Sequence, residues 1–312
     1  NKTKIMLLPK LSKKIFNLIS KKFSFQKKKI FNFYSELDKK DLIENENYLK
    51  IYKIFLDKNK IKINKTVDSY LEMCSDMFKC HIEFLRSGKY PVFDLKVAKK
   101  KVYNNHTKMK SYMVGLAISQ FFWKTHHRMF KHLQFFINNS KLSQSYLEIG
   151  PGHGLFAYYA FKNLKNLKNF HVIDISKTSL KLTKNFLELF LKNNQVKTKY
   201  IYGDFVKKKI NTKYDIIVCG EVIEHVSNPD KLLKRIHYYL NSKGKVFIST
   251  CINCPAIDHI NQWHTIDEIR KIYKKAKFKI MSEKILPVEK VSYKTALQNK
   301  ITVNYSAILQ KK

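Results

Sequence analysis

A run of glycines follows a short apolar segment near the middle of the chain. Residues 145–149 have the character of a buried strand, Glu148 lies near its end, and Gly150, Gly152 and Gly154 follow at alternate positions. Glycine is needed where the backbone turns tightly and approaches a ligand without a Cβ in the way. The helix expected from residue 155 presents unpaired N–H groups behind this loop. The segment therefore predicts a site for a nucleotide-like cofactor, with His153 beside it.

The glycine spacing separates this loop from other glycine-rich motifs. It fits E-x-G-x-G-x-G, whereas dinucleotide enzymes use G-x-G-x-x-G, and no Gly-Lys-Ser/Thr follows to bind phosphates. An ordinary turn between a strand and a helix is the alternative interpretation. The order of the acidic residues downstream favours the cofactor site.

Three further acidic residues stand at the ends of apolar segments. Asp174 lies near the end of residues 170–175, Asp204 near the end of 200–205, and Glu221 just after 214–219. A carboxylate at the tip of the second strand can accept hydrogen bonds from both ribose hydroxyls. Open α/β sheets place their ligands outside the carboxyl ends of the strands, so these acids are expected to share one site.

The spacing of apolar segments predicts the fold of residues 141–312. Seven segments read as strands: 145–149, 170–175, 200–205, 214–219, 245–250, 278–286 and 303–310. Pro229 after Asn228 and the capping box at 265–268 indicate two helix starts between strands. We expect an α/β domain with a Rossmann-like, mostly parallel, seven-stranded sheet and helices on both faces.

This order of motifs resembles the class I S-adenosylmethionine-dependent methyltransferases over residues 145–312. Residues 220–250 are similar to the same region of the ubiquinone-biosynthesis O-methyltransferases. The resemblance implies that S-adenosylmethionine is the cofactor. It places the methionine part at the glycine loop, the ribose at Asp174 and the adenine at Asp204. The residues it implies for cofactor binding are Glu148, Gly150, Gly152, His153, Gly154, Asp174, Ile175, Asp204, Phe205 and Glu221.

The first 140 residues contain no glycine-rich loop and read as helices. Helical periodicity occurs in residues 11–23, 48–57, 67–85 and, most strongly, 109–137. Residues 1–140 resemble the helical lids that precede the core of many small-molecule methyltransferases, and such a lid can exclude water. Candidates to face the pocket are Tyr112, Gln120, Trp123, His126 and His127, with core packing as the alternative for the aromatic residues.

Glu221, Glu224 and His225 stand at i, i+3 and i+4, so they would project from one face if this segment begins a helix. In one interpretation they bind Mg²⁺, which would orient and acidify a substrate hydroxyl. That pattern resembles the ubiquinone O-methyltransferases and the small-RNA 2′-O-methyltransferases. In the other, Glu221 contacts the cofactor and His225 is a lone base or a structural residue.

The loop after the fifth strand holds the remaining candidates. His259 and His264 are candidates for acid–base catalysis, because the resemblance places this loop beside the acceptor. Cys251 and Cys254 have C-x-x-C spacing, but there is no second pair to complete a tetrahedral zinc site. We therefore expect the cysteines to line the substrate site. Residues 287–301 are expected to form another wall.

The composition restricts the classes of partner. The net charge of +37 suits a polyanion, but about +19 lies in residues 1–140 and about +18 in 141–312, and only four of the 61 basic residues are arginine. An evenly spread lysine charge does not favour a nucleic-acid face. No apolar run approaches the roughly 18 residues that span a bilayer, and residues 5–9 are too short for a signal peptide. We expect a cytoplasmic protein with five free cysteines.

The sequence predicts an S-adenosylmethionine-dependent methyltransferase that acts on an oxygen or nitrogen atom of a small-molecule acceptor. The alternatives are a metal-assisted RNA 2′-O-methyltransferase, a non-methyl, cyclising use of the cofactor, and a non-catalytic scaffold. A homodimer is possible for an enzyme with a helical lid.

Overall fold

The computed structural model of the chain describes residues 8–92, 94–191 and 195–312. Within them, seven strands form one sheet in the order β3-β2-β1-β4-β5-β7-β6. The strands are β1 (Ser145–Ile149), β2 (Asn169–Asp174), β3 (Lys197–Tyr202), β4 (Tyr214–Gly220), β5 (Leu240–Ile252), β6 (Phe278–Pro287) and β7 (Val303–Lys311). All neighbours are parallel except the pairs that β7 makes with β5 and β6. The predicted mostly parallel sheet is confirmed.

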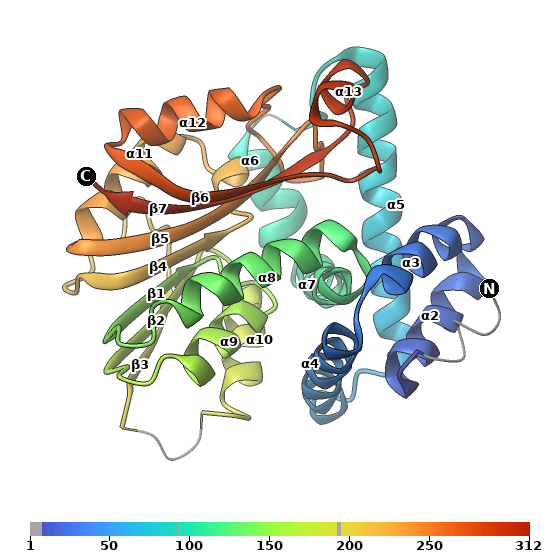
Figure 1. Cartoon of the computed structure of the whole chain (residues 1–312), viewed down its shortest axis with the longest axis horizontal. Coiled ribbons are helices and arrows are strands. Elements are labelled where there is room, and N and C mark those ends of the chain that lie inside the picture. The colour runs from blue at the N-terminus through green and yellow to red at the C-terminus, as the bar shows by residue number, and fades with distance from the viewer. Residues whose placement is uncertain (1–7, 93, 192–194) are drawn as a thin grey trace.

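Helices cover both faces of the sheet (Figure 1). One face carries α8 (Lys124–Asn138), α9 (Leu155–Asn163) and α10 (Lys177–Leu187), and the other carries α11 (Pro229–Tyr239) and α12 (Ile266–Lys275). The short α13 (Tyr293–Gln298) lies beside β6. Successive side chains of a strand point to opposite faces, so Tyr146 packs into one core and Leu147 into the other.

Two strands begin or end away from the predicted positions. β3 runs from Lys197 to Tyr202 and was expected at 200–205, so Asp204 lies in the loop after the strand. β5 begins at Leu240, five residues earlier than expected. Both strands have a polar segment at or near their start, and the prediction from apolar runs does not include such residues. β3 is an edge strand whose side chains are half-buried or exposed, and its lysines can therefore face solvent.

The described residues before 140 form helices, as the periodicity predicts. They are α2 (Lys10–Lys22), α3 (Ser24–Glu36), α4 (Lys39–Lys58), α5 (Ile63–Ser87), α6 (Leu95–Ala98), the π-helix η1 (Lys99–Tyr103), α7 (His106–Phe122) and α8. α4 begins at Asp38, whose side chain accepts a hydrogen bond from the Asp41 N–H, and α5 ends at Gly88 in the left-handed conformation.

The helical periodicity of residues 109–137 corresponds to two helices. The run is divided at Trp123, which has φ −107° and ψ 123° between α7 and α8. Tertiary contacts favour this break, because the Trp123 indole N–H donates to the Tyr70 hydroxyl at 2.7 Å and the ring contacts His126. Periodicity alone does not detect such a break, since the apolar spacing continues through it.

The two predicted helix starts after residue 220 are confirmed. The Asn228 side chain accepts a hydrogen bond from the Lys231 N–H, and Pro229 takes the first position of α11. The Thr265 hydroxyl accepts from the Glu268 N–H at the start of α12. From these starts, α11 packs against β5 and α12 against β6.

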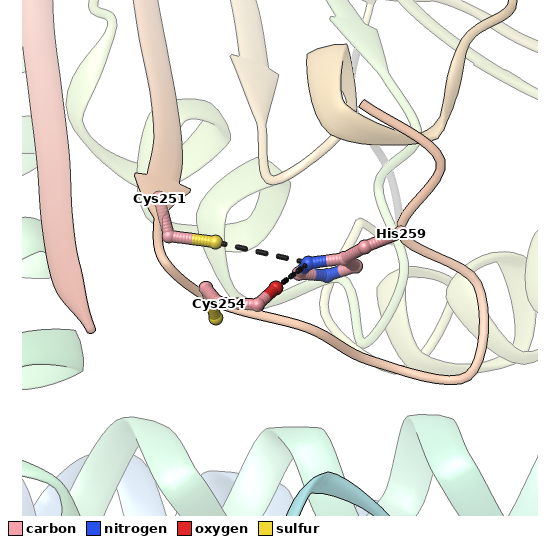
Figure 2. A group of neighbouring side chains, drawn as sticks. All are labelled: Cys251, Cys254 and His259. Carbon is pink, nitrogen blue, oxygen red and sulfur yellow. Dashed lines mark hydrogen bonds between the residues drawn. The ribbon is translucent and has the colours of Figure 1, made fainter. Parts of the chain in front are cut away.

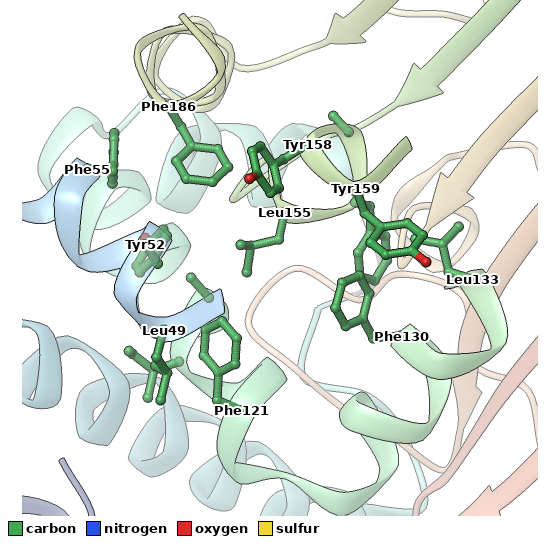
Figure 3. Close-up of a cluster of buried hydrophobic side chains, with 14 of the residues drawn as sticks. Leu49, Tyr52, Phe55, Phe121, Phe130, Leu133, Leu155, Tyr158, Tyr159 and Phe186 are labelled. Carbon is green, nitrogen blue, oxygen red and sulfur yellow. The ribbon is translucent and has the colours of Figure 1, made fainter. Parts of the chain in front are cut away.

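One hydrophobic core joins the N-terminal helices to the sheet. Tyr52 and Phe55 of α4 contact Phe186 of α10, with ring centroids 5.9 and 5.6 Å apart (Figure 3). Phe186 also contacts Tyr158 of α9, and all four side chains are buried. This core contains side chains from both sides of residue 140. The division into domains at 1–140 and 141–312 stays a prediction.

Two sequence-based expectations concern the chain as a whole. All five cysteines are buried and free, as expected. Among the residues described, no helix is both long and apolar enough to pass through a bilayer. Most of the short apolar segment at 5–9 lies outside the described residues.

Substitution of Phe186 tests the shared core. We expect Phe186→Ala to lower the free energy of unfolding by about 3–5 kcal/mol, because it leaves a cavity between α4, α9 and α10. Urea unfolding followed by circular dichroism measures this loss. The control is Phe135→Ala on α8, whose side chain is 57% exposed and should change stability by about 0.5 kcal/mol or less. Equal losses for both variants would contradict the shared core.

Candidate active site

A cavity of about 1530 Å³ lies where the carboxyl ends of the parallel strands face the N-terminal helices. The register brings the strand ends together, since Ile149 pairs with Ile173 and with Cys219. The cavity is lined by most of the residues expected to bind a cofactor: Glu148, Gly150, Gly152, His153, Asp174, Ile175, Asp204, Phe205 and Glu221. Gly154 does not line it and instead caps the start of α9.

The glycine loop depends on left-handed backbone. Gly150, Gly152 and Gly154 have φ values of +64°, +53° and +78°, which side chains rarely tolerate. A Cβ on Gly150 would lie 2.5 Å from Cγ2 of Val222, so the loop passes close to the segment after β4. The Gly150 N–H donates to the Ile173 carbonyl at 2.8 Å, which holds the loop against β2. The glycines thus keep a backbone wall beside the strand ends.

Glu148 is a buried acid whose charge is poorly compensated. Its side chain is 2% exposed, and the Tyr146 hydroxyl donates to Oε2 at 2.5 Å. Burial raises the pKa of Glu148 to about 8, against the smaller opposing effect of the Tyr146 hydrogen bond, and the nearby Asp174 raises it further. A ligand group that donates hydrogen bonds or carries positive charge would stabilise this carboxylate.

Asp174 is held by the start of α10. Its Oδ1 accepts from the Ser176 N–H at 2.7 Å, and its Oδ2 accepts from the Ser179 hydroxyl at 2.6 Å. Burial raises the pKa of Asp174 to about 6, although these hydrogen bonds lower it. The carboxylate is therefore fixed in orientation at the tip of β2. Neither serine had been singled out, because the role of each depends on the helix start.

Asp204 and Phe205 lie in the turn after β3. The Asp204 Oδ1 accepts from the Val206 N–H at 2.9 Å, which fixes the turn. Phe205 is buried and packs against Tyr239, with the Arg235 guanidinium 5.7 Å from its ring centroid. A carboxylate beside a flat apolar surface at a cavity wall suits a purine base.

The N-terminal helices close the cavity above the glycine loop. Of the five predicted pocket residues, Tyr112, Gln120, Trp123 and His126 line the cavity. His127 does not, because its ring packs on Phe33 at 5.4 Å. Burial lowers the pKa of His126 to about 4, so this ring is neutral at physiological pH.

Glu221, Glu224 and His225 do not project from one helical face. Residues 223–225 form a single 3₁₀ turn, and Glu221 precedes it with φ +52°. Potential ligand atoms instead cluster in two groups that share Glu224: one adds His225 and His259, and the other adds Glu221 and Cys251. Neither of these two groups contains all three predicted Mg²⁺ ligands, because a single 3₁₀ turn does not place them on one helical face.

His225 lies at the cavity wall with its ring orientation fixed. Its Nδ1 lies 2.9 Å from the Asp258 carbonyl oxygen, which can only accept, so Nδ1 carries the proton. Nε2 lies 3.9 Å from a Glu224 carboxylate oxygen. The Tyr103 ring packs against the imidazole, with ring centroids 6.4 Å apart. In the neutral tautomer, Nε2 of a ring held in this way can accept a proton.

His259 also lines the cavity, but its surroundings differ. Its Nδ1 donates to the Cys254 carbonyl oxygen at 2.6 Å. Burial lowers the pKa of His259, but the hydrogen bond and charge of the Cys254 thiolate, followed by Glu224 and Asp258, raise it to about 10. A ring that is already protonated cannot act as a base, so His225 is the better-placed histidine for that role.

His264 does not reach the cavity, contrary to the expectation that it serves acid–base chemistry. It is exposed, and its Nε2 lies 3.1 Å from the Gln262 side chain. The Asn253 N–H donates to the Trp263 carbonyl, and this contact buries Trp263 in the core and turns the next residue outward. Of the other expected walls, Cys254 and much of residues 287–301 line the cavity, whereas Cys251 does not.

Tyr103 and Asp258 are two further site residues that the sequence analysis does not single out. The Tyr103 hydroxyl donates to Asp258 Oδ2 at 3.2 Å, and Asp258 holds His225 through its backbone. Tyr103 reaches this place because η1 ends α6 with a wider π-helical turn. Asp258 stands one position before His259 in the loop after β5, and this proximity to a candidate histidine is the one feature that could have indicated it.

The buried charge of Glu148 predicts a pH-dependent stability. Its folded-state pKa of about 8 lies above the ordinary value of 4.5, so folding favours the neutral form. The stability contribution is complete at low pH and is lost as pH rises through about 8. We therefore compare the melting temperatures of Glu148→Gln and of the original protein, both without cofactor. The difference, variant minus original, is expected to increase between about pH 5 and pH 8. Scanning calorimetry measures this.

The control for that experiment is Glu188→Gln, which removes an exposed carboxylate at the end of α10. It should show no comparable rise across the same pH range. A difference between Glu148→Gln and the original protein that stays constant with pH would contradict the assignment of the raised pKa.

Comparison with known proteins identifies the family. A family model described as "Methyltransferase domain" matches residues 122–283. The mitochondrial ubiquinone biosynthesis O-methyltransferase of Saccharomyces cerevisiae is 30% identical over 107 residues, covering 34% of this chain and 33% of that protein. The chain thus spans about a third of the length of this relative. The Rickettsia prowazekii ubiquinone biosynthesis O-methyltransferase is 26% identical over 185 residues, covering 53% of the chain and 71% of that protein.

A solved structure shows the same fold. The N-methyltransferase NodS of Bradyrhizobium japonicum WM9, in complex with S-adenosyl-L-homocysteine, aligns with a TM-score of 0.50 at 11% identity. The alignment covers 67% of this chain and 98% of NodS. With the family match over half of the chain and the strand order of the sheet, the chain belongs to the methyltransferase domain family and has the fold of the class I S-adenosylmethionine-dependent methyltransferases.

Proposed function

We propose that this chain transfers a methyl group from S-adenosylmethionine to a hydroxyl oxygen of a small, largely apolar acceptor. The observation that carries the proposal is the position of His225 at the cavity wall, where Nδ1 contacts the Asp258 carbonyl oxygen and Nε2 is the ring nitrogen left to accept a proton in the neutral tautomer. A hydroxyl must lose its proton to become a good nucleophile, and a fixed neutral imidazole can accept that proton.

The cavity residues fit the cofactor. The glycine loop offers backbone that a Cβ would obstruct, and Glu148 is a buried acid that lacks a cationic partner among the contacts described. We assign the methionine part of the cofactor to Glu148 and the glycine loop, the ribose to Asp174, and the adenine to Asp204 with Phe205. When bound, the cofactor supplies a methyl group on a positively charged sulfur. Glu221 then lies on the methyl side, where its carboxylate favours that charge.

The rest of the cavity is suited to an apolar acceptor. Its walls on the side of the N-terminal helices include Ile30, Phe33, Met77, Leu116 and Phe122. The Trp123 indole and residues 287–292 close the same region. We propose that the helices of residues 1–140 act as a lid that removes water from around the acceptor, which strengthens the local electrostatic interactions.

His225 has the surroundings that proton transfer needs. The acceptor proton moves to Nε2, and the resulting imidazolium keeps its Nδ1–H on the Asp258 carbonyl oxygen. The Glu224 carboxylate oxygen 3.9 Å from Nε2 stabilises the new positive charge. Glu224 is almost fully buried, so this interaction is little screened by solvent.

The relatives support oxygen as the acceptor atom. Both sequence relatives are named as O-methyltransferases, although the chain covers only part of the yeast protein. The NodS structure is that of an N-methyltransferase, but at 11% identity it informs the fold alone. The even spread of positive charge over the chain does not support RNA as the acceptor.

Substitution of His225 tests the proposed reaction. The protein is incubated with radiolabelled S-adenosylmethionine and a metabolite extract, and a labelled ether is expected among the small molecules. His225→Ala should lower that rate by about 100-fold or more, because a general base contributes about 10²–10⁴. Cofactor affinity, measured by calorimetry, should remain. The matched control is His264→Ala, an exposed histidine outside the cavity.

Two outcomes would count against the proposal. Label that appears only in RNA would show a different acceptor class. Label in small molecules that is insensitive to His225→Ala would show that no proton passes through this ring.

The glycine loop allows a separate test of cofactor binding. We expect Gly150→Ala to weaken S-adenosylmethionine binding by at least about tenfold, since the left-handed conformation costs a non-glycine residue about 1–2 kcal/mol and the new Cβ meets Val222. Calorimetric titration measures the affinity. Gly88→Ala is the control, because Gly88 has φ +71° but no atom within 4 Å of its Cβ position. It should lower stability and leave the affinity unchanged.

A further inference from the structure

Three buried side chains meet beside the cavity, which Cys254 and His259 line and Cys251 does not. Cys251, Cys254 and His259 each place one potential ligand atom within 4.8 Å of the others (Figure 2). The two cysteines come from the end of β5 and the loop after it, and the same loop returns with His259. The proposed methyl transfer uses neither sulfur atom and assigns no step to His259. These three side chains therefore have no role in that mechanism.

We propose that Cys251, Cys254 and His259 bind a zinc ion. Two sulfur atoms and an imidazole nitrogen are a donor set that zinc prefers, and softer donors select it over Mg²⁺. The sequence offers no second cysteine pair, and the fold supplies a histidine in its place. This inference concerns metal binding and goes beyond the proposed methyl transfer.

A candidate fourth donor is the Glu224 carboxylate. Glu224 shares one group of close ligand atoms with Cys251 and another with His259. Its Oε2 accepts from the Thr250 hydroxyl at 2.9 Å, whereas its Oε1 is buried and has no hydrogen-bond partner. An unpaired buried carboxylate oxygen is costly, and a bound cation would satisfy it.

The geometry requires only a small contraction. Two sulfur atoms bound to one tetrahedral zinc at about 2.3 Å lie about 3.8 Å apart. The three donors are already within 4.8 Å of one another, so shifts of roughly 1 Å complete the site. The loop is anchored nearby, because the Cys254 N–H donates to the Tyr90 hydroxyl at 2.6 Å.

His259 faces the cysteines through one ring nitrogen. Its Nδ1 lies 3.8 Å from the Cys251 sulfur and 2.6 Å from the Cys254 carbonyl oxygen (Figure 2). Zinc binding through Nδ1 would replace the contact with the carbonyl oxygen, and the ring would carry its proton on Nε2.

Cobalt substitution tests the site without any methyl acceptor. The full chain, prepared free of metal and under reducing conditions, is titrated with Zn²⁺ and with Co²⁺. We expect one zinc per chain and a thiolate-to-cobalt charge-transfer band in the near ultraviolet. Loss of a second-shell contact weakens metal binding by about 10–100-fold. Cys251→Ser and Cys254→Ser each remove a direct ligand, so each should weaken zinc binding by more than that. Cys80→Ser, which removes a buried cysteine of α5 outside the cluster, is the matched control.

A ligand-preserving variant covers the case in which serine prevents folding. In Cys254→His the zinc should remain, and the charge-transfer intensity per cobalt should fall by about half, since one of two thiolates is left. Absence of the band in the original protein, its persistence in both serine variants, or a Cys251–Cys254 disulfide that binds no metal after reduction would each overturn the proposal. Cofactor binding, measured in the same samples, separates this failure from failure of the proposed function.

Discussion

The parallel register of β1 with its two neighbours is the constraint on which the site depends. Glu148 stands opposite Val172 of β2 and Val218 of β4, so the acidic residues that follow those strands emerge at the same edge. Asp174 is the last residue of β2, and Glu221 directly follows β4. A shift of one residue in either pairing would turn these side chains to the other face. Burial of β1 in two cores, with Tyr146 in one and Leu147 and Ile149 in the other, favours the observed register.

The N-terminal helices complete the site because they share a core with the sheet. Met113 of α7 lies 3.3 Å from the position of a Cβ on Gly152, and its sulfur lies 3.9 Å from the Ser179 hydroxyl. These helices are therefore in contact with the glycine loop and with the start of α10. Movement of the helices would change the surroundings of Asp174, which Ser179 orients. If they act as the proposed lid, its opening would disturb the proposed ribose site through the same contacts.

Short sequence patterns predict the parts of the site whose conformation depends on neighbouring residues in the chain. The glycine loop and the acids at the strand ends follow from backbone requirements and strand periodicity, and the seven strands were recognised from their apolar runs. Tertiary contacts determined the remainder. Trp123 breaks a continuous helical pattern because its indole bonds to Tyr70, and Glu221 adopts a left-handed conformation before a tight turn. Tyr103 joins the site through a π-helical turn, which has no simple sequence pattern.

Three acidic side chains near His225 have buried carboxylate oxygens that other protein groups do not compensate. Glu221, Glu224 and Asp258 each have a buried carboxylate oxygen without a hydrogen-bond partner. Burial, followed by the charge of Glu224, raises the pKa of Glu221 well above its usual range. Such groups lower the stability of the protein without ligands, and they are retained where a ligand compensates them. A sulfonium on one side and a metal ion on the other are both cations. Each would relieve the same set of carboxylates, so binding of one reduces the electrostatic gain left for the other.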